Sequence, residues 1–175
     1  MEKSSTLLIL ALFCVTISAQ STETDSEFSR KGKFMIETGY NIVSGFSTGT
    51  GLSSIIQDGA TLTSIGVEGG KMLTEDFGLK TNLSFLTGQG LNVSNFAAGL
   101  KYYMGGTAPL EFKTGYVVIG EFYNEVYSEL SVGYPFQLSD NIYLEPTVGF
   151  WTELGNFGDD GSANFIIDIS FAMFL

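Results

Sequence analysis

Ten charged side chains recur along this chain at spacings that put them on one face of alternating segments. They are Lys33, Glu37, Glu68, Lys80, Lys101, Glu111, Lys113, Glu129, Glu145 and Asp168. Six carboxylates and four lysines that share an enclosed space must pair or stay hydrated, because an isolated buried charge is costly. Two interpretations follow: a salt-bridged plug, which we favour, and a pore lined by acidic side chains.

Enzymatic chemistry has little to build on here. The chain contains no histidine, which removes the commonest general base, the commonest metal ligand and every Ser-His-Asp arrangement. Two carboxylates suffice for some hydrolases, but the spacing of the acids singles out no pair. We therefore predict that the protein is not an enzyme, and we assign no catalytic, cofactor-binding or metal-binding residue and no cofactor.

The first nineteen residues have the organisation of a secretory signal peptide. Lys3 precedes an apolar run over residues 7–17, and Ala19 offers a small-residue cleavage site. Cys14 leaves lipidation as an alternative, although bulky Phe13 stands where lipoprotein signals carry a small residue. Cleavage after Ala19 would leave a chain without cysteine, and so without thiol chemistry or disulfides.

The rest of the chain divides into a short polar stretch and one long domain. Residues 20–31 lack periodicity and are predicted to be a flexible leader. Residues 32–175 are rich in glycine and aromatic residues, which favours an all-β domain. The net charge of −11 argues against nucleic acid as a partner and gives no basic patch for phosphate headgroups.

The charged face belongs to eight segments in which apolar and polar residues alternate, the signature of half-buried strands. They cover residues 32–42, 61–72, 77–85, 96–104, 110–118, 127–136, 142–150 and 164–175. The second segment is the least regular, and Gly69 with Gly70 predicts a bulge or bend there. An even number of strands would bring both ends of the domain to one side.

The last segment is an apolar strand that runs to the final residue of the sequence. Its apolar face comprises Phe165, Ile167, Ile169, Phe171, Met173 and Leu175. An unpaired apolar edge invites aggregation, whereas in a closed barrel the last strand pairs with the first. We therefore predict that this strand closes an eight-stranded antiparallel up-and-down barrel and serves its assembly.

The connections between the segments differ at the two ends of the predicted barrel. Longer loops at residues 44–60, 88–92, 120–125 and 153–162 alternate with short turns at residues 74–76, 105–109 and 139–141. This asymmetry is typical of outer-membrane barrels. Pro135 and Pro146 fall nearly opposite each other across the last turn, which predicts a bulge or fraying because proline donates no ladder hydrogen bond.

The distribution of side chains indicates that the apolar face points outward to lipid. Nearly every strand charge lies on the opposite face, with Lys71 as the exception near a strand end, and a lysine facing lipid at the membrane midplane is costly. Aromatic residues gather at both ends of the apolar face, as membrane interfaces favour. The alternatives are a secreted lipocalin-like barrel with an apolar ligand inside and a narrow porin-like channel.

Residues 32–175 resemble the small outer-membrane β-barrels of the OmpA-transmembrane, OmpX and opacity-protein type. The resemblance rests on the signal peptide, the eight alternating strands, short turns such as residues 138–142 and the apolar last strand. Leu175 departs from the phenylalanine that usually ends the family's assembly signal. The resemblance implies an outer-membrane location, insertion by the barrel assembly machinery, contact with lipid and lipopolysaccharide, a monomer, and a structural or surface-interaction role.

Overall fold

The structure is a computed structural model that describes residues 29–41, 49–57, 60–120, 123–154 and 164–175. The predicted signal peptide, Cys14 and most of the predicted leader lie outside these residues. The strands are β1 (Phe34–Asn41), β2 (Gly51–Gln57), β3 (Ala60–Met72), β4 (Phe77–Gly88), β5 (Leu91–Met104), β6 (Ala108–Ile119), β7 (Tyr123–Gly133), β8 (Phe136–Ser139), β9 (Ile142–Glu153) and β10 (Asn164–Phe174). The described residues include no helix of the length and apolarity that crossing a membrane requires.

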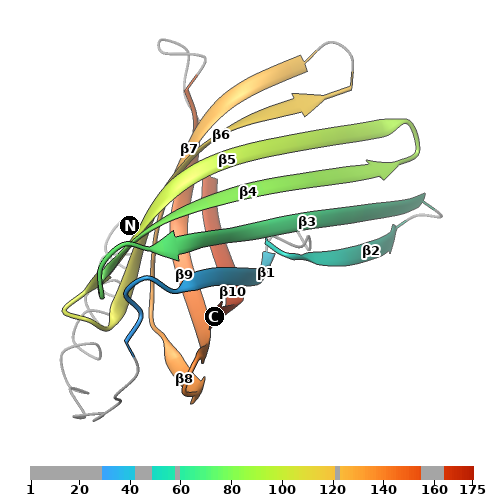
Figure 1. Cartoon of the computed structure of the whole chain (residues 1–175). Coiled ribbons are helices and arrows are strands. Elements are labelled where there is room, and N and C mark those ends of the chain that lie inside the picture. The colour runs from blue at the N-terminus through green and yellow to red at the C-terminus, as the bar shows by residue number, and fades with distance from the viewer. Residues whose placement is uncertain (1–28, 42–48, 58–59, 121–122, 155–163) are drawn as a thin grey trace, which may run out of the picture.

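Eight of these strands close into an antiparallel barrel (Figure 1). The order runs β1-β10-β9-β7-β6-β5-β4-β3, and β1 also pairs with β3 to complete the ring. The last strand therefore lies beside the first, with Phe174 opposite Met35 and Asp168 opposite Asn41. The predicted eight-stranded barrel is confirmed, because each of the eight strands pairs with another strand on both sides.

A strand occupies part of the segment that was predicted to be one long loop over residues 44–60. β2 pairs with the N-terminal half of β3, from Gly51 opposite Gly66 to Gln57 opposite Ala60. β1 pairs with β3 only over Phe34–Glu37, so β2 takes the place that β1 leaves. Thr50 fastens this junction: its amide donates to the Glu37 carbonyl (2.7 Å), and its hydroxyl bonds the backbone of Glu68 (2.8 Å).

Of the bulge or bend predicted at Gly69 and Gly70, the strand pairing contains no bulge. The β3–β4 register runs without a shift from Thr63 opposite Thr87 to Met72 opposite Gly78. The glycines instead permit close approach of neighbouring strands, since a Cβ on Gly70 would lie 2.0 Å from the Leu79 carbonyl oxygen. Glycine in a strand has both uses, and the sequence did not distinguish them.

The irregularity predicted at Pro135 and Pro146 is confirmed. β7 ends at Gly133 and β8 begins at Phe136, so Tyr134 and Pro135 belong to neither strand. The Tyr134 amide still donates to the Pro146 carbonyl (3.1 Å). The β8–β9 pairing also shifts register, between Gln137 and Ser139.

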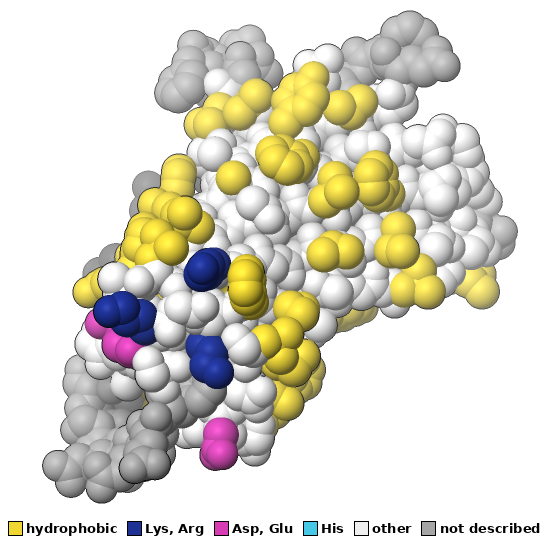
Figure 2. Space-filling model, viewed as in Figure 1, with side chains coloured by type: hydrophobic (Ala, Val, Ile, Leu, Met, Phe, Trp, Pro, Cys, Tyr) yellow, Lys and Arg dark blue, Asp and Glu magenta, His cyan; other side chains and the backbone are white. Residues whose placement is uncertain are grey.

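The two faces of the barrel wall differ sharply in composition. Large hydrophobic side chains are exposed on the outside, including Leu83, Phe96 and Phe150, and Figure 2 shows hydrophobic side chains spread over the visible face. Glu37, Lys101 and Glu145 are buried inside. At the short-turn end, an apolar cluster fills the interior and comprises Met35, Met72, Tyr103, Tyr143, Ala172 and Phe174.

Candidate functional site

The candidate site is the charged interior of the barrel, and seven ring strands contribute to its ion pairs. Period-two alternation sends these side chains inward from consecutive strands. The carboxylates are Glu37 on β1, Glu68 on β3, Glu111 on β6, Glu129 on β7 and Glu145 on β9. The lysines are Lys80 on β4, Lys101 on β5 and Lys113 on β6.

Lys101 is the centre of the deeper half of this network. Its side chain is completely buried, and its ammonium pairs with Glu37, with Glu111 at 3.0 Å and with Glu145 at 2.5 Å. The other Glu145 oxygen accepts a hydrogen bond from the Tyr103 hydroxyl at 2.8 Å. One lysine therefore ties β1, β6 and β9 together across the interior.

Lys80 and Lys113 extend the network towards the long-loop end. Lys80 pairs with Glu37, with Glu68 at 2.7 Å and with Glu111 at 2.6 Å. Lys113 pairs with Glu129 at 2.9 Å and reaches Glu68 at 4.0 Å. Because Glu37 and Glu111 each contact both Lys80 and Lys101, the ion pairs form one connected layer.

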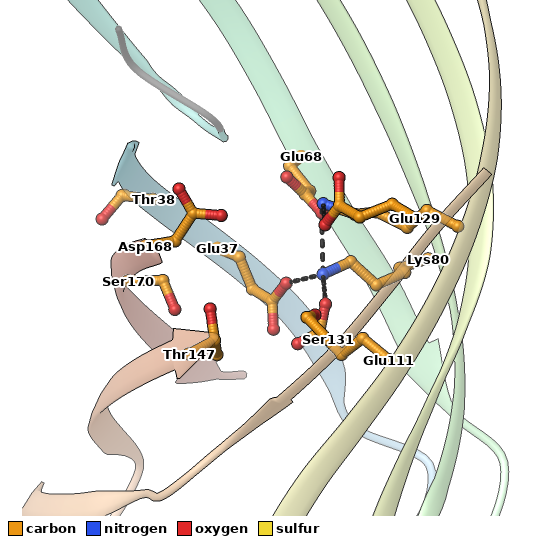
Figure 3. Close-up of a pocket in the computed structure, with 11 residues that line it drawn as sticks. Glu37, Thr38, Glu68, Lys80, Glu111, Glu129, Ser131, Thr147, Asp168 and Ser170 are labelled. Carbon is orange, nitrogen blue, oxygen red and sulfur yellow. Dashed lines mark hydrogen bonds and ion pairs between the residues drawn. The ribbon is translucent and has the colours of Figure 1, made fainter. Parts of the chain in front are cut away.

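A small polar cavity lies beside this layer. Figure 3 shows Thr38, Asp168, Ser170 and Thr147 on one side of the cavity, facing Glu37 and Lys80. Asp168 is the charge that β10 contributes to the interior. Lys33 lies on the inward-facing register of the chain just before β1 and is half-buried, outside the ion pairs described above.

A residue from the predicted leader, Arg30, lies at the short-turn end of the interior. The Arg30 guanidinium lies 4.0 Å from the Tyr103 ring centroid and 5.6 Å from that of Tyr143. It also donates to the Gly106 carbonyl at 3.1 Å. Arg30 thus covers the apolar cluster from the short-turn end.

Glu75 in the first short turn holds the chain that carries Arg30. The Ser29 hydroxyl donates to one Glu75 oxygen (2.5 Å), and the Arg30 amide donates to the other (2.9 Å). These hydrogen bonds, chiefly that from Ser29, lower the pKa of the Glu75 carboxyl from its ordinary value of 4.5. The contact therefore favours the ionised carboxylate.

One group of carboxylates has a spacing that a metal ion could use. Glu37, Glu111 and Glu145 each offer an oxygen within 4.8 Å of the others. The Lys101 ammonium already pairs with all three. The cation that this group holds is a lysine of the chain itself.

Sequence reasoning missed several polar members of the interior because their residue types are not charged. Tyr103 caps Glu145, and Tyr127 donates from its hydroxyl to Asn95 at 3.1 Å. The signal was available in the alternation, since Tyr103 follows Lys101 by two positions. Gly115 makes room for Tyr127, because a Cβ there would lie 2.5 Å from its ring.

The fold has counterparts among solved structures, whereas the sequence has none among known families. No protein-family model and no curated protein matches the chain. The N-terminal β-barrel domain of OprF from Pseudomonas aeruginosa aligns with a TM-score of 0.52 and 11% identity, over 83% of this chain and 98% of that domain. OprG from the same organism (TM-score 0.46, 11% identity, 86% and 99% covered) and a designed transmembrane barrel (0.45, 14%, 84% and 98%) also match. The chain thus has the fold of the OprF barrel domain.

Proposed function

We propose that this protein is an integral outer-membrane β-barrel with a structural or surface-interaction role, such as adhesion or envelope integrity, and with a plugged lumen. One observation carries the proposal: the wall is apolar outside, and the charged side chains of its middle are inside and paired. Lipid tolerates a closed sheet because every backbone group finds a partner within the wall. It also demands that charges stay off the outer face.

The outer face supports the proposal through its aromatic residues. Exposed aromatic side chains near the long-loop end are Tyr40, Phe85, Phe96, Phe150 and Phe165. Those nearer the short turns are Phe34, Tyr102, Phe112, Phe136 and Phe171. Two such groups with aliphatic residues between them suit the two interfaces of a bilayer.

The two alternatives fit the interior less well. A lipocalin-like carrier needs an apolar cavity for its ligand, whereas the described cavity is lined by charged and hydroxyl side chains. A porin-like channel needs an open path. Here the ion pairs and the apolar cluster with Arg30 occupy successive levels of the interior.

The location and the partners follow from the same proposal. A signal peptide over residues 1–19 would direct the chain out of the cytoplasm, and the barrel assembly machinery would insert it. Lipid and lipopolysaccharide would surround it as a monomer. The extracellular partner that a surface role requires would meet the long loops, parts of which lie outside the described residues.

Membrane insertion is tested by cell fractionation and by gel mobility. We expect the protein to stay with outer-membrane fragments, to need detergent for extraction and to run faster on a gel when unheated than when boiled. We expect this behaviour because a closed barrel with an apolar outer face needs lipid or detergent around it. Release with the soluble periplasmic fraction, in a form that binds an apolar dye in its interior, would favour the lipocalin-like alternative instead.

A further inference from the structure

We propose that the short-turn end of the barrel carries a docking surface for anionic glycerophospholipid headgroups. The surface, called the rim patch below, consists of Lys31 and Lys71 together with the apolar side chains Phe34 and Leu73. This inference rests on the proposed membrane location, and it names a class of lipid that the barrel would select.

The net charge of −11 predicted no basic patch for phosphate headgroups, but net charge does not describe local distribution, and the basic residues of the chain are distributed unevenly between the two ends. Apart from Lys3 and the interior residues Lys80, Lys101 and Lys113, the eight basic residues include only Arg30, Lys31, Lys33 and Lys71. All four lie at the short-turn end, where Figure 2 shows several basic side chains, together with acidic ones, on the visible face. The predicted long loops at residues 44–60, 88–92, 120–125 and 153–162 contain no lysine or arginine.

The backbone brings Lys31 and Lys71 to one corner of the barrel. The Gly32 amide donates to the Met72 carbonyl (2.9 Å), and the Met72 amide donates to the Lys33 carbonyl (2.9 Å). In the β1–β3 register, Phe34 lies opposite Lys71. Residues 31–34 therefore run directly alongside the end of β3.

Both lysines of the rim patch are exposed. Among the described residues, no carboxylate oxygen lies within 4 Å of either ammonium. The Glu75 carboxylate accepts from the Ser29 hydroxyl and the Arg30 amide, and it also takes a backbone hydrogen bond from Lys31. Arg30 itself is committed to Tyr103 and to the Gly106 carbonyl, so we leave it out of the patch.

The apolar half of the patch gives it the character of a lipid surface. Phe34 is 60% exposed, Leu73 is 46% exposed, and the Lys71 ammonium lies 5.4 Å from the Phe34 ring centroid. At the interface between membrane and water, an aromatic side chain contacts the part of the acyl chain next to the headgroup, and a lysine beside it reaches the headgroup. A phosphate carried on an acyl chain fits both halves, and basic residues near an anionic lipid surface are stabilising.

Native mass spectrometry of the detergent-folded barrel, offered equal amounts of phosphatidylglycerol and phosphatidylethanolamine, tests the proposal. We expect the unaltered protein to retain phosphatidylglycerol preferentially, less so at high salt, because salt screens exposed charges. The double variant Lys31→Gln/Lys71→Gln should lose roughly five-fold of this preference per lysine, the ratio that ~1 kcal/mol per basic residue implies. The matched control Lys31→Arg/Lys71→Arg keeps both charges and should keep the preference.

The outcomes separate this inference from the proposed function. Insertion into vesicles of either lipid, with equal retention of the two lipids, would overturn the rim patch and leave the membrane barrel standing. Failure to enter vesicles of any composition would overturn both. If the glutamine variant did not fold, as judged by its gel mobility, the salt dependence of the unaltered protein would decide, and a salt-insensitive preference would refute the patch.

Discussion

Lys101 is a residue at which the ion pairs of the interior can be tested directly. Its ammonium meets carboxylates from three strands, and its side chain is 0% exposed. Lys101→Met keeps the length of the side chain but leaves Glu37, Glu111 and Glu145 without this partner. We expect a loss of about 3–5 kcal/mol in the free energy of unfolding, because unpaired buried charges are costly. Urea titration followed by gel mobility in lipid vesicles measures it.

The matched control for Lys101→Met removes a carboxylate as well. Adding Glu145→Gln to Lys101→Met deletes one of the charges left unpaired, so we expect the double variant to recover part of the lost stability. A cost below ~1 kcal/mol for Lys101→Met alone would mean that water reaches this level of the interior and that the network is not a plug.

At the scale of the strand, the alternation in β10 predicts that a charge is tolerated on its inner face and costly on its outer face. Ile169 lies between the aromatic ends of the outer face and is 40% exposed, whereas Asp168 beside it is buried inside. Ile169→Lys places a charge where we propose lipid, and we expect it to destabilise the barrel by about 2–4 kcal/mol. The same urea titration in vesicles measures this cost.

A lysine at the rim provides the control for depth. Leu138 in β8 is exposed at the short-turn end, and Leu138→Lys should cost only about 0–1 kcal/mol, because the penalty falls near the interface. If both lysines were tolerated equally in vesicles, the outer face would not be in contact with hydrocarbon, and the proposed membrane location would be wrong.

At the scale of the whole molecule, ion pairs and apolar side chains occupy successive levels of the interior. The ion-pair layer crosses the barrel, and the apolar cluster lies beneath it with Arg30 over its aromatic rings. We therefore expect the barrel in a planar bilayer to pass no steady nanosiemens-scale current. Arg30→Ala should leave it closed as well, because the ion-pair layer does not involve Arg30.

Steady, cation-selective current from the unaltered protein would contradict the plug and favour the acidic-pore interpretation. The variant Lys101→Met serves as the comparison that is expected to conduct more than the unaltered barrel. Lys101→Met, if it folds, removes the cation that joins β1, β6 and β9, and we expect it to raise the frequency of brief openings above that of the unaltered barrel.

The alternation of residue types was enough to predict the fold class and the division of side chains between the two faces. Alternation with period two is local, so each strand reveals which of its residues share a face without knowledge of its neighbours. This is why the eight strands, the interruption at Pro135 and the outward position of Lys71 could be predicted from the sequence. The charges on one face also indicated that their side chains would meet.

Which charges meet, and how the wall closes, could not be predicted from the separate strands. The joining of Glu37, Glu111 and Glu145 by Lys101 depends on the relative height of β1, β5, β6 and β9, which no single strand encodes. The replacement of β1 by β2 beside β3, and the placement of Arg30 over Tyr103, depend on contacts between residues far apart in the chain. Local sequence fixes the direction of a side chain, whereas register and closure are properties of the assembled sheet.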